Sequence, residues 1–222
     1  MDATSHAASR AQRRLNRSTN RLSPTSTATC ATVLHDRGDA DGAVALLRKA
    51  LDAQRASFGE EHPDVLRAMN NLGWGIKATG GDLEEAMQLM RQALQGQRAI
   101  LGDHHPDTLT SINKLGLLLQ DRGADDEAIA LCEEALEARR QLLGAHHHST
   151  LISCCSLGSL LLERGEVGRA ATLFQEAVDG ARATLGEAHP STQNFLKHLA
   201  VASRQQLGTP AGPTSSAPPL FQ

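Results

Sequence analysis

Histidine is the first residue type to consider for chemistry in this chain. Ten histidines are present, and several are adjacent in sequence. His104 and His105 form a pair, and a run of three, 146–148, begins 42 residues further on. Neutral imidazoles are common ligands of zinc and other transition metals, so these clusters could carry a zinc-dependent enzyme. However, no Asp or Glu recurs beside them at a ligand spacing, and single histidines, His62 and His189, occupy the same place elsewhere. We therefore interpret one histidine at each place as a helix cap and expect no metal site.

Two other residue sets could be nucleophilic. Ser111 and Lys114 have the spacing of a Ser-Xaa-Xaa-Lys motif, but no companion motif is present and both fall within a predicted helix. The four cysteines stand at apolar positions of helical patterns rather than at a disulfide or zinc spacing: Cys30, Cys132, Cys154 and Cys155. These positions predict buried, reduced thiols. We expect no catalytic residue, no enzyme activity and no cofactor.

The composition excludes several classes of function. A net charge of −3 gives no field that would attract nucleic acid, and an aromatic content of 2% without tyrosine gives few platforms for base stacking. No apolar run approaches the roughly 20 residues that a membrane-spanning helix needs. We expect a soluble, cytoplasmic chain with no nucleic-acid or membrane partner.

Both ends of the sequence differ in composition from the middle. Residues 1–23 carry five arginines and a single acidic residue, which predicts a disordered basic tail: Arg10, Arg13, Arg14, Arg17 and Arg21. The alternative is a transit peptide, which would place the protein in an organelle. Residues 208–222 are rich in Pro, Ser and Thr, and we predict a disordered tail there as well.

The middle of the chain is an internal repeat. Gly-Xaa-Xaa-His segments begin at Gly59, Gly102, Gly144 and Gly186, with periods of 43, 42 and 42 residues. Between them lie two stretches with helical periodicity, separated by glycines at Gly38, Gly80 and Gly81, Gly123 and Gly165. Each repeat is therefore predicted to form a helix, a tight turn and a second helix. Units of this kind bury their apolar faces only by stacking into a solenoid.

Recurring positions predict which residues pack in the stack. In the first helix a leucine precedes a small residue, so the backbones can approach closely: Leu72-Gly73, Leu115-Gly116, Leu157-Gly158 and Leu199-Ala200. Residues three positions earlier extend an apolar stripe: Met69, Ile112, Cys154 and Leu196. In the second helix two alanines seven residues apart predict a flat seam: Ala43, Ala86, Ala128 and Ala170, then Ala50, Ala93, Ala135 and Ala177. We expect the leucines between them to fill the core: Leu46, Leu89, Leu131 and Leu173.

One cation recurs near the end of every second helix: Arg55, Arg98, Arg140 and Arg182. A cation at this end opposes the negative pole of the helix dipole. We expect each arginine to reach the acidic residue that opens the next helix, such as Asp64 or Asp107. The alternative is a row of arginines that binds an acidic ligand.

This combination of Leu-Gly, paired alanines and period resembles the tetratricopeptide repeat, in the longer form of about 42 residues that is similar to kinesin light chains. The resemblance covers residues 24–207. It implies an all-α, right-handed α-solenoid of about four helix pairs, with a C-terminal capping helix near residues 191–207. It also implies that the first helices line a concave groove.

The resemblance then indicates which residues would bind a ligand in that groove. They are the first-helix residues that face away from the Leu-Gly seam: Arg67, Asn70, Trp74, Lys77, Thr110, Asn113, Leu117, Gln120, Lys197 and Arg204. Asn70 and Asn113 match the asparagines that hold a peptide backbone in related repeats. Trp74 lies either in the groove or buried against the preceding repeat. The basic residues at both ends indicate a ligand with acidic residues.

The sequence therefore predicts a protein-interaction scaffold or adaptor that binds an extended, acidic peptide or a partner helix. The alternative is the sensor portion of a signalling NTPase whose catalytic domain lies outside this sequence. A nucleotide-binding motif encoded upstream would favour the alternative, and stoichiometric metal in the purified protein would favour the zinc-dependent enzyme.

Overall fold

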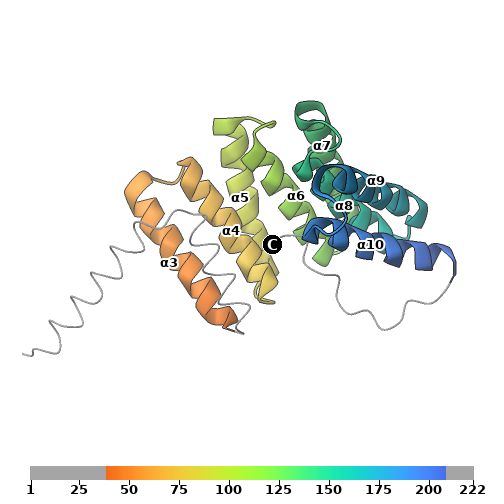
Figure 1. Cartoon of the computed structure of the whole chain (residues 1–222). Coiled ribbons are helices and arrows are strands. Elements are labelled where there is room, and N and C mark those ends of the chain that lie inside the picture. The colour runs from red at the N-terminus through yellow and green to blue at the C-terminus, as the bar shows by residue number, and fades with distance from the viewer. Residues whose placement is uncertain (1–38, 209–222) are drawn as a thin grey trace, which may run out of the picture. The chain divides into compact units, whose positions relative to one another are not determined.

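A computed structural model describes residues 39–208, and every regular element in this range is a helix of 16 to 19 residues (Figure 1). The first helices of the repeats are α4 (Pro63–Ala78), α6 (Pro106–Asp121), α8 (His148–Glu163) and α10 (Pro190–Gln206). The second helices are α3 (Ala40–Phe58), α5 (Leu83–Leu101), α7 (Asp125–Leu143) and α9 (Val167–Leu185). The predicted all-α repeat fold is confirmed. The described residues do not include the predicted first helix of the first repeat. They also do not include the predicted N-terminal tail or residues 209–222 of the predicted C-terminal tail.

The joints between repeats explain why these helices begin and end where they do. At each joint the Nδ1 atom of one histidine accepts the N–H two residues later, at 3.2 Å: His62, His105, His147 and His189. This bond satisfies one of the N–H groups that a helix start leaves without a partner. The preceding helix ends at a glycine with φ between 82° and 89°: Gly59, Gly102, Gly144 and Gly186. The predicted histidine caps are confirmed.

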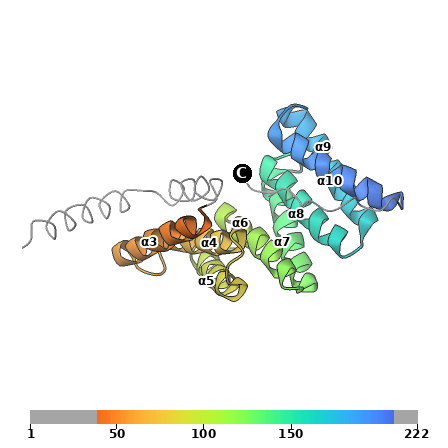
Figure 2. The same ribbon diagram turned by 90° about the horizontal axis from the view of Figure 1, so that it is seen from below.

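The chain divides into two compact units, at Asp103 and His104. In the first unit α4 packs against α3 and against α5. In the second unit α6 packs against α7, and α8 packs against α6, α7 and α9. The last helix, α10, packs against α9 and α8, and Figure 2 shows these three helices side by side. Each helix pair is therefore buried by a neighbouring helix, as stacking requires.

The predicted close contact between paired helices is confirmed at the small residues. A methyl group added at Gly158 would lie 2.7 Å from the Phe174 ring, and one added at Gly73 would lie 2.5 Å from the Met90 side chain. The seam alanines are buried in every repeat, with exposures from 0% to 4%. Interiors packed this tightly tolerate no added volume without strain.

The prediction that the second-helix leucines fill the core is wrong by one position. The four leucines are half-buried, whereas the residues that follow them are buried: Leu47, Met90, Cys132 and Phe174. A residue four positions after the first alanine lies on the same helix face as that alanine, while a residue three positions after it lies at the edge of the face. Leu46, Leu89, Leu131 and Leu173 therefore form a half-exposed row beside the seam.

The last helix departs from the predicted stripe. Leu196 is half-buried, although Met69, Ile112 and Cys154 at the same repeat position are fully buried. In the described range no second helix follows α10, so this face has no covering helix. α10 instead buries Phe195 and His198, which are 2% and 6% exposed, and the His198 ring stacks on Phe174 at 5.4 Å between centroids.

Candidate functional site

The predicted groove residues on α4 lie in the first unit and are partly accessible. Trp74 is half-buried, and the Nζ atom of Lys77 lies 5.3 Å from the centroid of its ring. This distance is within the range of a cation–π contact. Arg67 is half-buried and pairs with Asp64 one turn earlier. Asn70 is only 4% exposed, so α4 presents a tryptophan and two cations rather than an open asparagine.

The predicted groove residues on α6 lie in the second unit and are mostly covered. Thr110 and Gln120 are half-buried, and Leu117 is 7% exposed. Asn113 is fully buried, and its Nδ2 atom donates to Ser156 Oγ on α8 at 2.9 Å. Its Oδ1 atom accepts no hydrogen bond within residues 39–208. In this arrangement Asn113 joins two consecutive first helices and keeps one acceptor unused.

The two groove residues predicted on α10 are both exposed, namely Lys197 and Arg204. They lie in the second unit, with Thr110 and Asn113. No finding tests the predicted set of ten as a binding site, so its role stays a prediction.

A buried arginine near Thr110 was missed by the sequence reasoning. Arg139, on α7, is 4% exposed. Its guanidinium donates to Thr110 Oγ1 at 3.0 Å, to Ser153 Oγ at 2.6 Å and to the Ser149 carbonyl at 3.2 Å. Burial lowers the pKa of Arg139 to about 10. All these acceptors are uncharged, and no carboxylate within the described range pairs with this cation.

The sequence did contain a signal for this site. Gln54 and Gln97 stand at the same repeat position as Arg139 and are also buried, at 7% and 1% exposure. The replacement of a glutamine by an arginine at a buried repeat position marks the third repeat as chemically different. A buried cation is costly unless it is paired or serves a ligand.

The cysteines and Ser111, the other candidates for chemistry, have structural roles. Burial raises the pKa of the Cys132 and Cys154 thiols to about 12 and also raises the pKa of Cys155. Thiols with raised pKa values are poor nucleophiles and poor metal ligands. The predicted buried, reduced thiols are confirmed at these three positions, and Cys30 lies outside the described residues. Ser111 Oγ donates to the Asp107 carbonyl at 3.0 Å, within its own helix.

The recurring arginines form ion pairs at the joints or with the next second helix. Arg55, Arg98 and Arg182 each pair with an acidic residue five positions later, at the joint itself: Glu60 at 3.0 Å, Asp103 at 3.2 Å and Glu187 at 2.6 Å. The joint residue is closer in sequence to the helix end than Asp64 or Asp107, so a shorter reach suffices. The third joint has Ala145 at this place, and Arg140 pairs instead with Glu176 on α9, at 2.6 Å.

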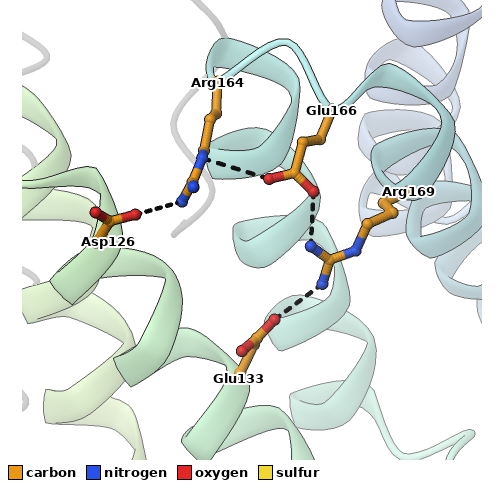
Figure 3. A network of polar contacts seen from close by, with 5 residues as sticks. All are labelled: Asp126, Glu133, Arg164, Glu166 and Arg169. Carbon is orange, nitrogen blue, oxygen red and sulfur yellow. Dashed lines mark hydrogen bonds and ion pairs between the residues drawn. The ribbon is translucent and has the colours of Figure 1, made fainter.

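A chain of polar contacts crosses the second helices of the second unit (Figure 3). Asp126 on α7 pairs with Arg164 at 2.6 Å, and Arg164 contacts Glu166 at 3.4 Å. Arg169 on α9 then joins Glu166 at 2.7 Å and Glu133 on α7 at 2.9 Å. These side chains are largely accessible, so each pair stabilises the fold little, but together they link α7 to α9 and to the turn between α8 and α9.

Two negative observations apply to residues 39–208. No group of three His, Cys, Asp or Glu side chains in this range is arranged to hold a metal ion. No helix in the same range is both long enough and apolar enough to cross a membrane.

These features define a class of protein, namely the helical repeat proteins in which capped helix pairs stack through a small-residue seam. The family model for the tetratricopeptide repeat matches residues 25–99 and 112–183, more than half of the chain, and the chain belongs to this family. Tetratricopeptide repeats are generally scaffolds that bind other proteins, and the fold is typically not catalytic.

Solved structures of kinesin-light-chain-like repeats are similar to this chain. A Podosopora anserina protein, described as having nearly identical TPR-like repeats of the kinesin light chain type, is 29% identical, with a TM-score of 0.69, over 86% of this chain and 88% of its own. A variant of that protein is 28% identical, with a TM-score of 0.70 and the same coverage. BtubC (BKLC) from P. vanneervenii is 17% identical, with a TM-score of 0.64 over 100% of this chain and 99% of its own, and this likeness shows the fold alone. No curated protein matches the sequence significantly.

Proposed function

We propose that this chain is a protein-interaction scaffold whose first-helix faces bind an extended peptide with acidic residues. The observation that carries the acidic preference is Arg139, a buried guanidinium with only uncharged acceptors around it. Because Arg139 is only 4% exposed, a ligand carboxylate reaches it by displacing the hydroxyl group of the half-buried Thr110. The resulting charge-assisted bond is stronger than the present bond to that hydroxyl group. Thr110, one of the predicted groove residues, is in direct contact with this guanidinium.

The accessible cations on the first helices support the same ligand. Lys77 stands beside Trp74 on α4, and Lys197 and Arg204 are exposed on α10. A tryptophan that is half-buried provides an apolar surface for an aliphatic anchor, and the lysine beside it attracts acidic neighbours of that anchor. We place the protein in the cytoplasm, because the composition and the reduced cysteines favour that compartment.

Calorimetric titration tests the proposal. The probe is the amidated peptide Asp-Glu-Leu-Asp-Glu, compared with Lys-Lys-Leu-Lys-Lys. The test variant is Arg139→Gln, because the first and second repeats carry Gln54 and Gln97 at this buried position. The matched control is Arg182→Gln, which removes the same charge from an exposed joint.

We expect the acidic peptide to bind the wild type, to weaken as salt rises, and to lose about tenfold in affinity with Arg139→Gln but not with Arg182→Gln. Equal affinity for the acidic and basic peptides would contradict the proposal. Equal losses in the two variants would mean that net charge, and not Arg139, decides the binding.

A further inference from the structure

A second candidate site lies on the second helices of the second unit, away from the predicted groove residues. A pocket of about 390 Å³ opens between α7 and α9, with α8 beneath it. We call it the α7/α9 pocket. Its apolar lining is Leu136 and Leu157, each 3% exposed, and the half-buried Leu173. Leu173 belongs to the half-exposed leucine row. Because it is not buried in the core, its side chain leaves apolar surface accessible between the two helices.

Two ion pairs bridge the helices beside this pocket. Glu133 on α7 pairs with Arg169 on α9 at 2.9 Å, and Arg140 on α7 pairs with Glu176 on α9 at 2.6 Å. Three of these four residues line the pocket, namely Glu133, Arg140 and Arg169. At the joint beside the second bridge, Ala145 stands where the other joints have a carboxylate, so Arg140 has no acidic partner there. In the other repeats this arginine pairs with a carboxylate at the joint, whereas in the third repeat it pairs with a carboxylate on another helix, beside the pocket.

The charges around the pocket do not balance. Glu137 also lines it, and its carboxylate accepts from the amide of Gln141 at 2.8 Å rather than from a cation. Arg140 and Arg169 pair with three carboxylates, those of Glu133, Glu166 and Glu176, and Arg140 also attracts the carboxylate of Glu137. The charged side chains that line the pocket balance one another. With Glu166 and Glu176, which pair with Arg169 and Arg140, carboxylates outnumber guanidinium groups even when Arg164 is counted, and this favours a cationic group at the rim.

We propose that the α7/α9 pocket binds an aromatic side chain of a partner protein that carries a basic residue next to it. The volume is at the small end of ligand sites, which run from about 300 to 1,000 Å³, so it suits one side chain rather than a large ligand. The leucines provide an apolar floor for the ring, and the guanidinium groups of Arg140 and Arg169 favour an aromatic face over an aliphatic one. The neighbouring basic residue pairs with Glu137.

This inference does not depend on the acidic ligand proposed for the first-helix faces. The two sites prefer partners of opposite charge, and although α7 contributes to both, they use different residues of that helix. One scaffold could therefore hold two partners at once, and neither would compete for the residues of the other.

Titration followed by ¹H–¹⁵N NMR tests the pocket. The probe is acetyl-Trp-Arg-amide, compared with acetyl-Trp-Glu-amide and acetyl-Ala-Arg-amide. We expect saturable shifts at residues of α7 and α9 with a Kd of about 1 mM for acetyl-Trp-Arg-amide, and weaker binding of both comparison peptides. The absence of saturable shifts at these helices up to about 10 mM would overturn the proposal, as would equal binding of the Glu-containing peptide.

Three variants locate the binding. Thr172→Trp, at an exposed lining residue of α9, fills the pocket and should abolish the shifts while the thermal unfolding transition persists. Glu137→Arg should weaken binding about tenfold. Its matched control, Glu163→Arg, makes the same charge change at an exposed residue outside the pocket and should leave the affinity unchanged. If Thr172→Trp folds and still binds, or if the two arginine variants lose affinity equally, the pocket is not the site.

Discussion

The same ion pair occurs in the two units with opposite polarity. In the first unit Arg48 on α3 donates to Glu85 on α5, with one bond of 2.6 Å. In the second unit Glu133 on α7 stands at the repeat position of Arg48, and Arg169 on α9 stands at that of Glu85. The cation and the carboxylate have changed places. The repeat therefore fixes where second helices are bridged, and each pair of neighbours fixes which helix supplies which charge.

The largest expected effect concerns a feature that both units share, the alanine seam. Ala135→Leu should destabilise the fold by about 1 to 3 kcal/mol, because Ala135 is fully buried and the added volume has no space. Thermal unfolding measures the loss. Leu142→Ala, at a residue that is 53% exposed on the same helix, serves as the control and should shift Tm little. An unchanged Tm for Ala135→Leu would show that the seam is not closely packed.

Charge reversal tests the comparison itself. Glu133→Arg should lower Tm, by less than Ala135→Leu does, because two guanidinium groups would then face each other across α7 and α9. Adding Arg169→Glu should restore part of the Tm, since it recreates the polarity that Arg48 and Glu85 show in the first unit but removes the pair with Glu166. The effect should shrink at high salt. If the double variant is as unstable as the single one, the cation and the carboxylate cannot be exchanged between α7 and α9 at this position.

A pH effect should distinguish α10 from α4. Burial lowers the pKa of His198 from its ordinary value of 6.5, whereas Asn71 at the same position of α4 does not titrate there. The unfolded state therefore takes up a proton near pH 6.5 before the folded state does, and stability falls as pH drops through this value. Urea unfolding at a series of pH values measures the slope. His198→Asn should reduce it without removing it, because burial also lowers the pKa of His148. An unchanged slope would assign the effect to other groups.

The smallest expected effect concerns the joints. Ala145→Glu gives Arg140 the local partner that Arg55 has in Glu60. We expect Arg140 to leave Glu176, with almost no change in Tm because exposed pairs contribute little. The NMR signal of the Arg140 side chain should move, while that of Arg182 should not. A signal that stays in place would mean that Glu176 holds Arg140 for reasons other than the missing carboxylate.

Local sequence patterns predicted most of the fold, because the residues that set it act on near neighbours. A histidine cap reaches two residues along the chain, and a helix-ending glycine needs only its own backbone freedom. The leucine row was predicted to fill the core, but the residues one position later do so. Periodicity indicates which face of a helix is buried, but it does not show where the edge of that face lies. The family resemblance supplied the stacking, which no single repeat encodes.

The candidate sites were harder to predict, because they depend on contacts between repeats. Asn113 was expected to face a ligand, yet it bonds Ser156, which is 43 residues away in sequence. Arg139 was not singled out, although its departure from Gln54 and Gln97 was visible. Comparing repeat copies for changes in charge would have found both Arg139 and the reversal at Glu133.

The reversed polarity also bears on how such a chain can change by gene duplication. Repeat arrays gain and lose units by unequal recombination, which joins repeats that were not neighbours before. Loss of two repeats, with α5 and α7, would bring α3 against α9, and Arg48 would then face Arg169. The two guanidinium groups would repel each other, so the new junction would lack the bridge that each unit has at this place.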